Sequence, residues 1–129
     1  MSKPITDGYA NIPPRVAGTD NRYAWQSVVT GAAAVSADLW AGYAAAEKPK
    51  GKVWMEFESE TTVAHFRLSR TATTGTTTSN GTTVNITAGS FRHAHLVDPT
   101  IDLFVDVIAT GAGVFKWRMC SPPVERTDI

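Results

Sequence analysis

Short segments in which apolar and polar residues alternate occupy most of the chain between residues 23 and 120. Alternation of this kind puts successive side chains on opposite faces of a β-strand. The clearest example is the segment 52–59, in which Val53, Met55 and Phe57 fall on one face and Trp54 falls on the other. Strands are predicted at residues 23–30, 52–59, 62–69, 82–87, 91–97, 101–109 and 114–120.

The breaks between these segments predict how the strands connect. Short turns at residues 60–61 and 110–113 each separate two neighbouring strands, so we expect two antiparallel hairpins. The stretch 70–81 consists of Thr, Ser, Asn and Gly with almost no large apolar side chain, which is typical of a solvated loop.

The Ala-rich segment 35–46 fits two local structures. Leu39 and Tyr43 are four residues apart, which is the spacing of one helix face. Gly42 weakens a helix, and two short strands around a turn fit the segment as well. The sequence leaves both structures open.

Strands that recur every 8–12 residues or so predict an all-β domain. We expect an antiparallel β-sandwich or jelly roll of about 7–8 strands, which spans residues 21–123. Residues 1–20 are punctuated by Pro and Gly and show no periodicity, so they are predicted to form an extended N-terminal arm. Residues 124–129 are predicted to be a short polar tail.

The arm carries isolated apolar side chains that suit either of two roles. A frayed terminus is one, and an arm that lies on a neighbouring subunit is the other. In the second case the apolar side chains anchor the arm. The candidate partner-binding residues are Ile5, Tyr9, Ile12, Pro13, Pro14 and Arg15 in the arm, together with Trp54 in the domain.

The charge balance argues against two classes of partner. Twelve Lys and Arg residues face twelve Asp and Glu residues, which gives a formal net charge of zero. Proteins that bind nucleic acid through phosphates usually carry a basic excess, so neither a nucleic acid nor a membrane surface is expected as partner. The single cysteine, Cys120, excludes an intrachain disulfide and reads as a small buried apolar residue. The first residues show no signal-peptide pattern, so synthesis in a cytoplasm is expected.

Two groups of residues could carry chemistry. His93 and His95 are two apart on a strand and share a face, so with Asp98 and with His65 from a neighbouring strand they are weak candidates for a metal site. A structural role is the preferred interpretation, and no cofactor is expected.

The acidic residues fit structural roles as well. Glu56 and Glu58 share a strand face and are interpreted as a solvated outer face, or as a sheet edge protected by charge, rather than a paired-carboxylate catalytic site. Asp102 and Asp106 are expected to pair with lysine or arginine across the last hairpin, namely with Lys116 or Arg118. The sequence contains no Ser-His-Asp order, GxSxG elbow, Gly-rich phosphate loop or HExxH motif, so we predict that the protein is not an enzyme.

Tryptophan is abundant, with four residues in the chain. If Val53, Met55 and Phe57 fill the core, Trp54 must lie on the outer face or in an interface. Large exposed aromatic side chains mark binding sites for protein partners or for sugars. A ligand- or carbohydrate-binding β-sandwich module is therefore the alternative to a structural subunit.

The region from Lys52 to Cys120 resembles small β-sandwich virion proteins of tailed bacteriophages. The resemblance lies in the strand Lys52-Val-Trp-Met-Glu-Phe-Glu, the Thr- and Gly-rich loop 71–81, and the strand Ile101-Asp-Leu-Phe-Val-Asp-Val-Ile-Ala that precedes Thr-Gly-Ala-Gly. It implies a head decoration (cement) protein or a minor capsid-associated protein that stabilises a capsid lattice, or a neck or tail structural role. The implied partners are the major capsid protein and copies of the chain itself, as a trimer, and the implied location is the virion.

Overall fold

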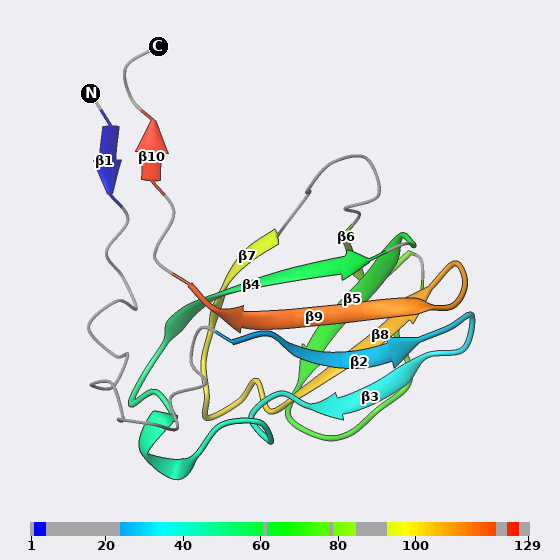
Figure 1. The fold of residues 1–129 in the computed structure, drawn as a ribbon, viewed down its shortest axis with the longest axis horizontal. Coiled ribbons are helices and arrows are strands. Elements are labelled where there is room, and N and C mark those ends of the chain that lie inside the picture. The colour runs from blue at the N-terminus through cyan, green and yellow to red at the C-terminus, as the bar shows by residue number, and fades with distance from the viewer. Residues whose placement is uncertain are drawn as a thin grey trace.

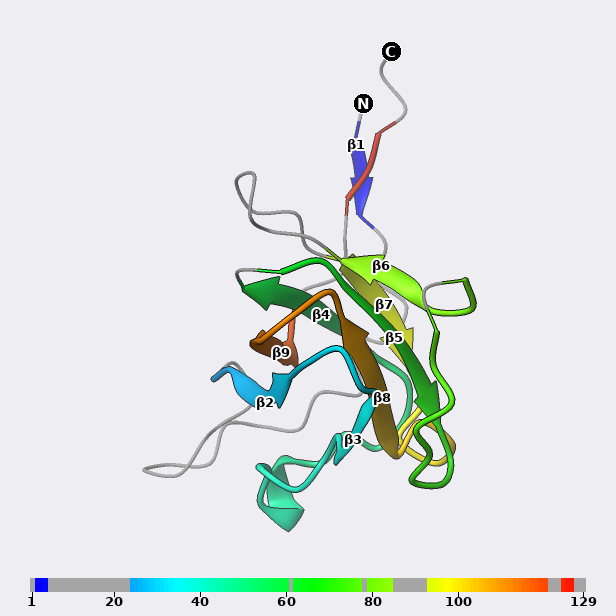
Figure 2. The same ribbon diagram turned by 90° about the vertical axis from the view of Figure 1, so that its right-hand side faces the viewer.

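In the computed structural model, which describes residues 2–4, 24–60, 62–77, 79–84, 93–120 and 124–126, eight strands form two four-stranded antiparallel sheets. The order of the first sheet is β2 (Gln26–Thr30), β9 (Gly113–Met119), β4 (Val53–Glu60) and β7 (His93–Val97). The order of the second is β3 (Val35–Asp38), β8 (Phe104–Ala109), β5 (Ala64–Ser69) and β6 (Thr82–Val84). The sheets face each other (Figure 1, Figure 2), so the predicted all-β sandwich is confirmed.

Strand pairing is nested along the chain. β2 pairs with β9, β3 with β8, β4 with β7 and β5 with β6, and every pair is antiparallel. The first of these strands thus pairs with the last, and the second pairs with the next to last, as if one long hairpin had been rolled up. This is the arrangement of a double-sheet jelly roll, the second of the two predicted forms.

Neither of the two predicted hairpins forms. β4 and β5 lie in different sheets, and so do β8 and β9, so both short turns carry the chain from one sheet to the other. These turns and the β2–β3 turn lie at one end of the sandwich (Figure 1). There the Ala109 amide donates to the Gly31 carbonyl at 3.0 Å, and the Thr110 amide donates to the Val63 carbonyl at 3.1 Å.

The faces predicted from the alternation are confirmed. Val53, Met55 and Phe57 are fully buried between the sheets. The ring of Phe57 stacks on that of Phe66, with 4.6 Å between centroids, and on that of Phe115, with 6.0 Å. Aromatic rings from three strands and both sheets therefore form the centre of the core.

The segment 35–46 forms neither of the two structures that the sequence left open. β3 occupies its first residues, the chain then turns, and a single 3-10 turn follows at Ala45–Glu47. Leu39 and Trp40 are buried against the end of the core. The indole Nε1 of Trp117 donates to the Leu39 carbonyl at 3.0 Å, which ties this turn to β9.

The two ends of the chain pair with each other. β1 (Ser2–Pro4) and β10 (Val124–Arg126) form an antiparallel two-stranded sheet, with Lys3 opposite Glu125 in the register. It stands apart from the two larger sheets in Figure 1. Part of the predicted polar tail is thus a strand. The rest of the predicted arm and tail lies outside the described residues.

Among the glycines of the described ranges, Gly81 has the neighbours that can least give way to a side chain. A Cβ atom there would lie 2.8 Å from Thr76 Cγ2, 2.9 Å from His65 Cβ and 3.0 Å from the Phe66 amide nitrogen. We expect Gly81→Ala to lower the free energy of unfolding by about 1–3 kcal/mol, since backbone and Cβ atoms cannot rotate out of the way. Urea unfolding followed by fluorescence measures this change.

Gly31→Ala is the matched control, because nothing lies within 4 Å of a Cβ atom at that position. It should leave the unfolding midpoint nearly unchanged. Equal losses in the two variants would show that the contacts around Gly81 are not the cause.

Candidate binding surfaces

The outer face of the first sheet carries a set of ion pairs between β4 and β9. Lys116 on β9 binds two carboxylates of β4, with its Nζ 3.0 Å from Glu58 Oε1 and 3.0 Å from Glu60 Oε1. Two residues further along β9, on the same face, Arg118 Nε pairs with Glu56. We call these five residues the ion-pair ladder. Opposite charges on adjacent strands stabilise a sheet, so the ladder holds β4 and β9 in register.

The ladder is more buried than the sequence predicted. Glu58 is only 4% exposed, while Glu60 at the strand end keeps 47% of its side chain exposed. The expectation of a solvated outer face at Glu56 and Glu58 is therefore wrong. Burial by itself lowers the pKa of Lys116, but hydrogen bonds to Glu60 and Glu58 outweigh it and raise that pKa. The ion pairs thus favour the charged form of the lysine.

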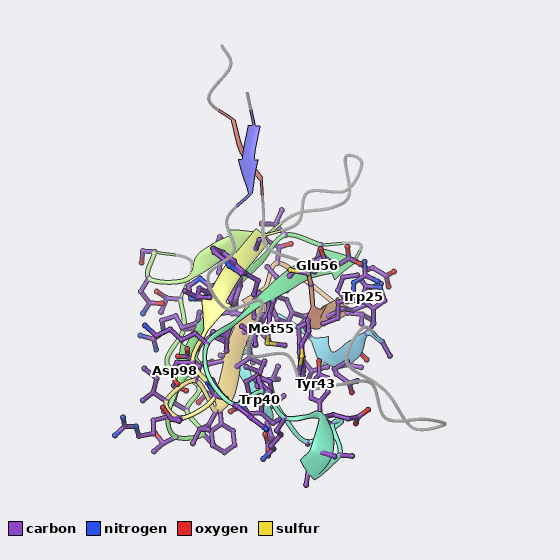
Figure 3. All side chains as sticks on the ribbon, turned by 90° about the vertical axis from the view of Figure 1, so that its left-hand side faces the viewer. Trp25, Trp40, Tyr43, Met55, Glu56 and Asp98 are labelled. Carbon is purple, nitrogen blue, oxygen red and sulfur yellow. The ribbon has the colours of Figure 1, made fainter. Side chains whose placement is uncertain are left out.

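Trp25 joins the ladder from the chain just before β2. The centroid of its ring lies 4.1 Å from the guanidinium carbon of Arg118 and 5.0 Å from Lys116 Nζ. Figure 3 shows Trp25 beside Glu56 at one side of the sheet. Cations over an indole ring are attracted by its π electrons. The sequence did not single out Trp25, because 93 residues separate it from Arg118 and no local pattern links them.

Trp54, the partner-binding residue predicted on the sheet, lies on the outer face but is only half exposed. Its indole Nε1 is buried and has no hydrogen-bond partner within the described part of the chain. The Trp54 carbonyl accepts the Cys120 amide at 3.0 Å, so Cys120 lies beside it directly after β9. The role of Trp54 in binding stays a prediction. The arm candidates Ile5, Tyr9, Ile12, Pro13, Pro14 and Arg15 lie outside the described residues.

Burial, reinforced by the negative charge of Glu56, raises the pKa of the Cys120 thiol from 9.0 to about 11. The thiolate is the species that reacts with alkylating agents. In the folded protein we therefore expect the alkylation rate to rise with pH up to about 11, whereas in urea it should level off near 9. Mass spectrometry after timed iodoacetamide treatment measures both curves, because Cys120 is the only cysteine. Identical curves in the two states would contradict the prediction.

The outer face of the second sheet holds a buried carboxylate, Asp106 on β8, which is 0% exposed. Its Oδ2 accepts the Thr76 amide at 3.0 Å and the Thr73 hydroxyl at 3.1 Å, and Arg67 on β5 lies 3.7 Å away. The Thr76 hydroxyl donates to the Asp106 carbonyl at 3.1 Å. Asp106 thus anchors the Thr-rich loop to the sheet.

Two sequence expectations fail at this anchor. The loop 70–81 is not wholly solvated, because Thr76 is buried. Asp106 pairs with Arg67 rather than with Lys116 or Arg118, because β8 and β9 are in different sheets.

Asp102 departs from its expected pairing too. Its Oδ2 accepts the Asp98 amide at 2.8 Å, within the turn that follows β7. Hydrogen bonds from Thr100 lower the pKa of Asp98, whose Oδ1 accepts both the Thr100 hydroxyl and the Thr100 amide. This pair of aspartates therefore shapes a turn.

The candidate metal residues are spread over both sheets. His65 lies on β5 and therefore in the other sheet, so the expectation that it joins His93 and His95 is wrong. His95 is opposite Met55 in the β4–β7 register and is exposed at the edge of the sandwich. The side chain of His93 is outside the description. Within the described part of the chain, no group of three potential ligands could hold a metal ion.

None of the described helices is long and apolar enough to cross a membrane. In comparisons with known proteins, the chain matches no family model, no curated protein and no solved structure.

Proposed function

We propose that the chain is a structural virion protein that binds and stabilises a phage capsid lattice as a decoration or cement protein. The observation that carries the proposal is the ion-pair ladder, in which each glutamate is paired with a lysine or an arginine. Glu56 and Glu58, the carboxylates best placed for paired-acid chemistry, are bound by Arg118 and Lys116. These charges serve to stiffen a sheet, as a scaffold requires.

Two further observations support the proposal. Double-sheet jelly rolls occur in viral capsid proteins, although they also occur in lectin domains and cupins. The resemblance of residues 52–120 to phage virion proteins favours the first of these classes. Many copies, each with a modest interface, would clamp a lattice through their combined binding. The proposed partners are the major capsid protein and further copies of the chain in a trimer.

Particle composition tests this function. Virions or induced prophage particles from the source of the sequence are purified on a density gradient and analysed by quantitative mass spectrometry. The chain should be present in a fixed ratio to the major capsid protein and should remain bound after washing. Its absence from purified particles would overturn the proposal.

The lectin class makes a carbohydrate-binding module the second candidate, and Trp25 is the observation that favours it. Its indole is a half-buried aromatic ring just before β2, against the cations of the first sheet's outer face, and sugars stack on aromatic rings. Arg118 and Lys116 already lie over the ring, however, which leaves less of it for a ligand. A glycan-array signal that disappears in Trp25→Ala would support this candidate.

A further inference from the structure

The edge strand β2 lacks the features that usually protect a sheet edge. It pairs only with β9 among the described strands, so its other side is an edge of the first sheet. Its five residues, Gln-Ser-Val-Val-Thr, include no charge and no proline. The other edges differ, since β3 ends in Asp38, β6 has only three residues, and β7 carries two histidines. Exposed strands without charge or proline readily pair with another strand.

Within the described ranges, the most exposed large apolar side chain lies on this edge. Val29 is 73% exposed, and Ile101 at 42% is the only other large apolar residue described as exposed. Val29 is paired in register with Val114 on the outer face. An added strand beside β2 would therefore cover apolar surface as well as satisfy backbone groups.

We propose that β2 pairs with β2 of a second copy of this chain, antiparallel and about a twofold axis. Two identical edges satisfy each other by symmetry, and each copy then covers the Val29 of the other. The cations of the adjacent strand β9 do not oppose the contact, because Lys116 and Arg118 are neutralised by glutamates within their own copy. The chain as a whole has no net charge to repel a second copy.

The size of the contact sets its strength. A pair of five-residue strands buries far less than the roughly 1,600 Å² of a standard stable interface. The pairing is therefore weak in dilute solution and becomes populated where copies are held close together, as on a lattice. In that respect the inference rests on the proposed function. Because a twofold contact cannot close a trimer, it joins a copy in one trimer to a copy in the next.

Site-specific cross-linking tests the pairing in the full-length chain. Cys120→Ser removes the natural thiol, and Val29→Cys or Ile101→Cys then introduces one exposed thiol. Concentrated protein is treated with the shortest bis-maleimide reagent and analysed by denaturing electrophoresis. We expect covalent dimers of the Val29→Cys variant to form at least about tenfold faster than those of Ile101→Cys, because the β2 edges meet. Adding Ser27→Lys, which puts like charges at the edge, should remove the difference.

Equal cross-linking of the two variants, or a Val29→Cys rate that Ser27→Lys does not change, would overturn the inference. Circular dichroism of each variant establishes that the fold is retained. The same cross-linking is repeated on particles that carry the Val29→Cys chain, to identify which protein lies beside β2. Cross-links to a different protein would show that β2 accepts a foreign strand. Failure of self-pairing leaves the particle composition result unaffected, so the two proposals fail separately.

Discussion

Replacing Phe57 by alanine is expected to lower the free energy of unfolding by about 3–5 kcal/mol, the usual cost of removing a buried phenylalanine ring. Phe57 is fully buried, and its ring contacts both Phe66 and Phe115 between the sheets. Small domains are stable by only about 5–15 kcal/mol, so the variant should be close to unfolding at room temperature. Urea titration, followed by tryptophan fluorescence and circular dichroism, measures the loss.

Val29→Ala is the control for this change, because Val29 is exposed. It should cost less than about 1 kcal/mol. If Phe57→Ala were as mild as Val29→Ala, the three phenylalanines could not be the centre of the core.

The second large effect is expected at Asp106. Asp106→Ala leaves the Thr76 amide buried without its acceptor, and it removes the acceptor of the Thr73 hydroxyl and the carboxylate that pairs with Arg67. Loss of a charged acceptor and of a buried hydrogen bond should lower stability by about 2–4 kcal/mol. The loss should be local as well as global, so amide hydrogen exchange at residues 73–77 should become faster than in the core strands.

Asp106→Asn separates the hydrogen bonds from the charge. Its amide oxygen still accepts the Thr76 amide, so the variant should lose roughly half as much stability and keep most of the loop protection. Unchanged exchange at residues 73–77 in Asp106→Ala would mean that the loop is held by other contacts.

The sequence predicted the elements and the faces of the strands well. Alternation is a local property, because successive side chains of a strand point to opposite faces of the sheet. The burial of Val53, Met55 and Phe57 therefore followed from the pattern alone. The breaks at Asp98-Pro99 and after Thr30 were also evident, because Pro and Gly act on their own stretch of backbone.

Partner choice between strands could not be predicted in the same way. The turns at 61–63 and 110–112 have the length of hairpin turns, yet both connect the two sheets. An alternating strand offers the same ladder of backbone groups to any neighbour, so the pattern says which face is buried but not which strand lies beside it. Only the packing of the complete core selects the nested pairing.

The candidate surfaces likewise combine features that the sequence determined with features that only the tertiary structure decided. The sequence by itself determined that the chain forms a small all-β domain, that 52–59 carries acids on its outer face, and that Cys120 has no partner for a disulfide. The tertiary structure alone decided that Lys116 and Arg118 neutralise those acids, that Asp106 anchors the Thr-rich loop, and that β2 is left as an edge. The reason is physical: alternation and turn chemistry act over a few residues, whereas ion pairs, buried anchors and free edges depend on segments that only folding brings together.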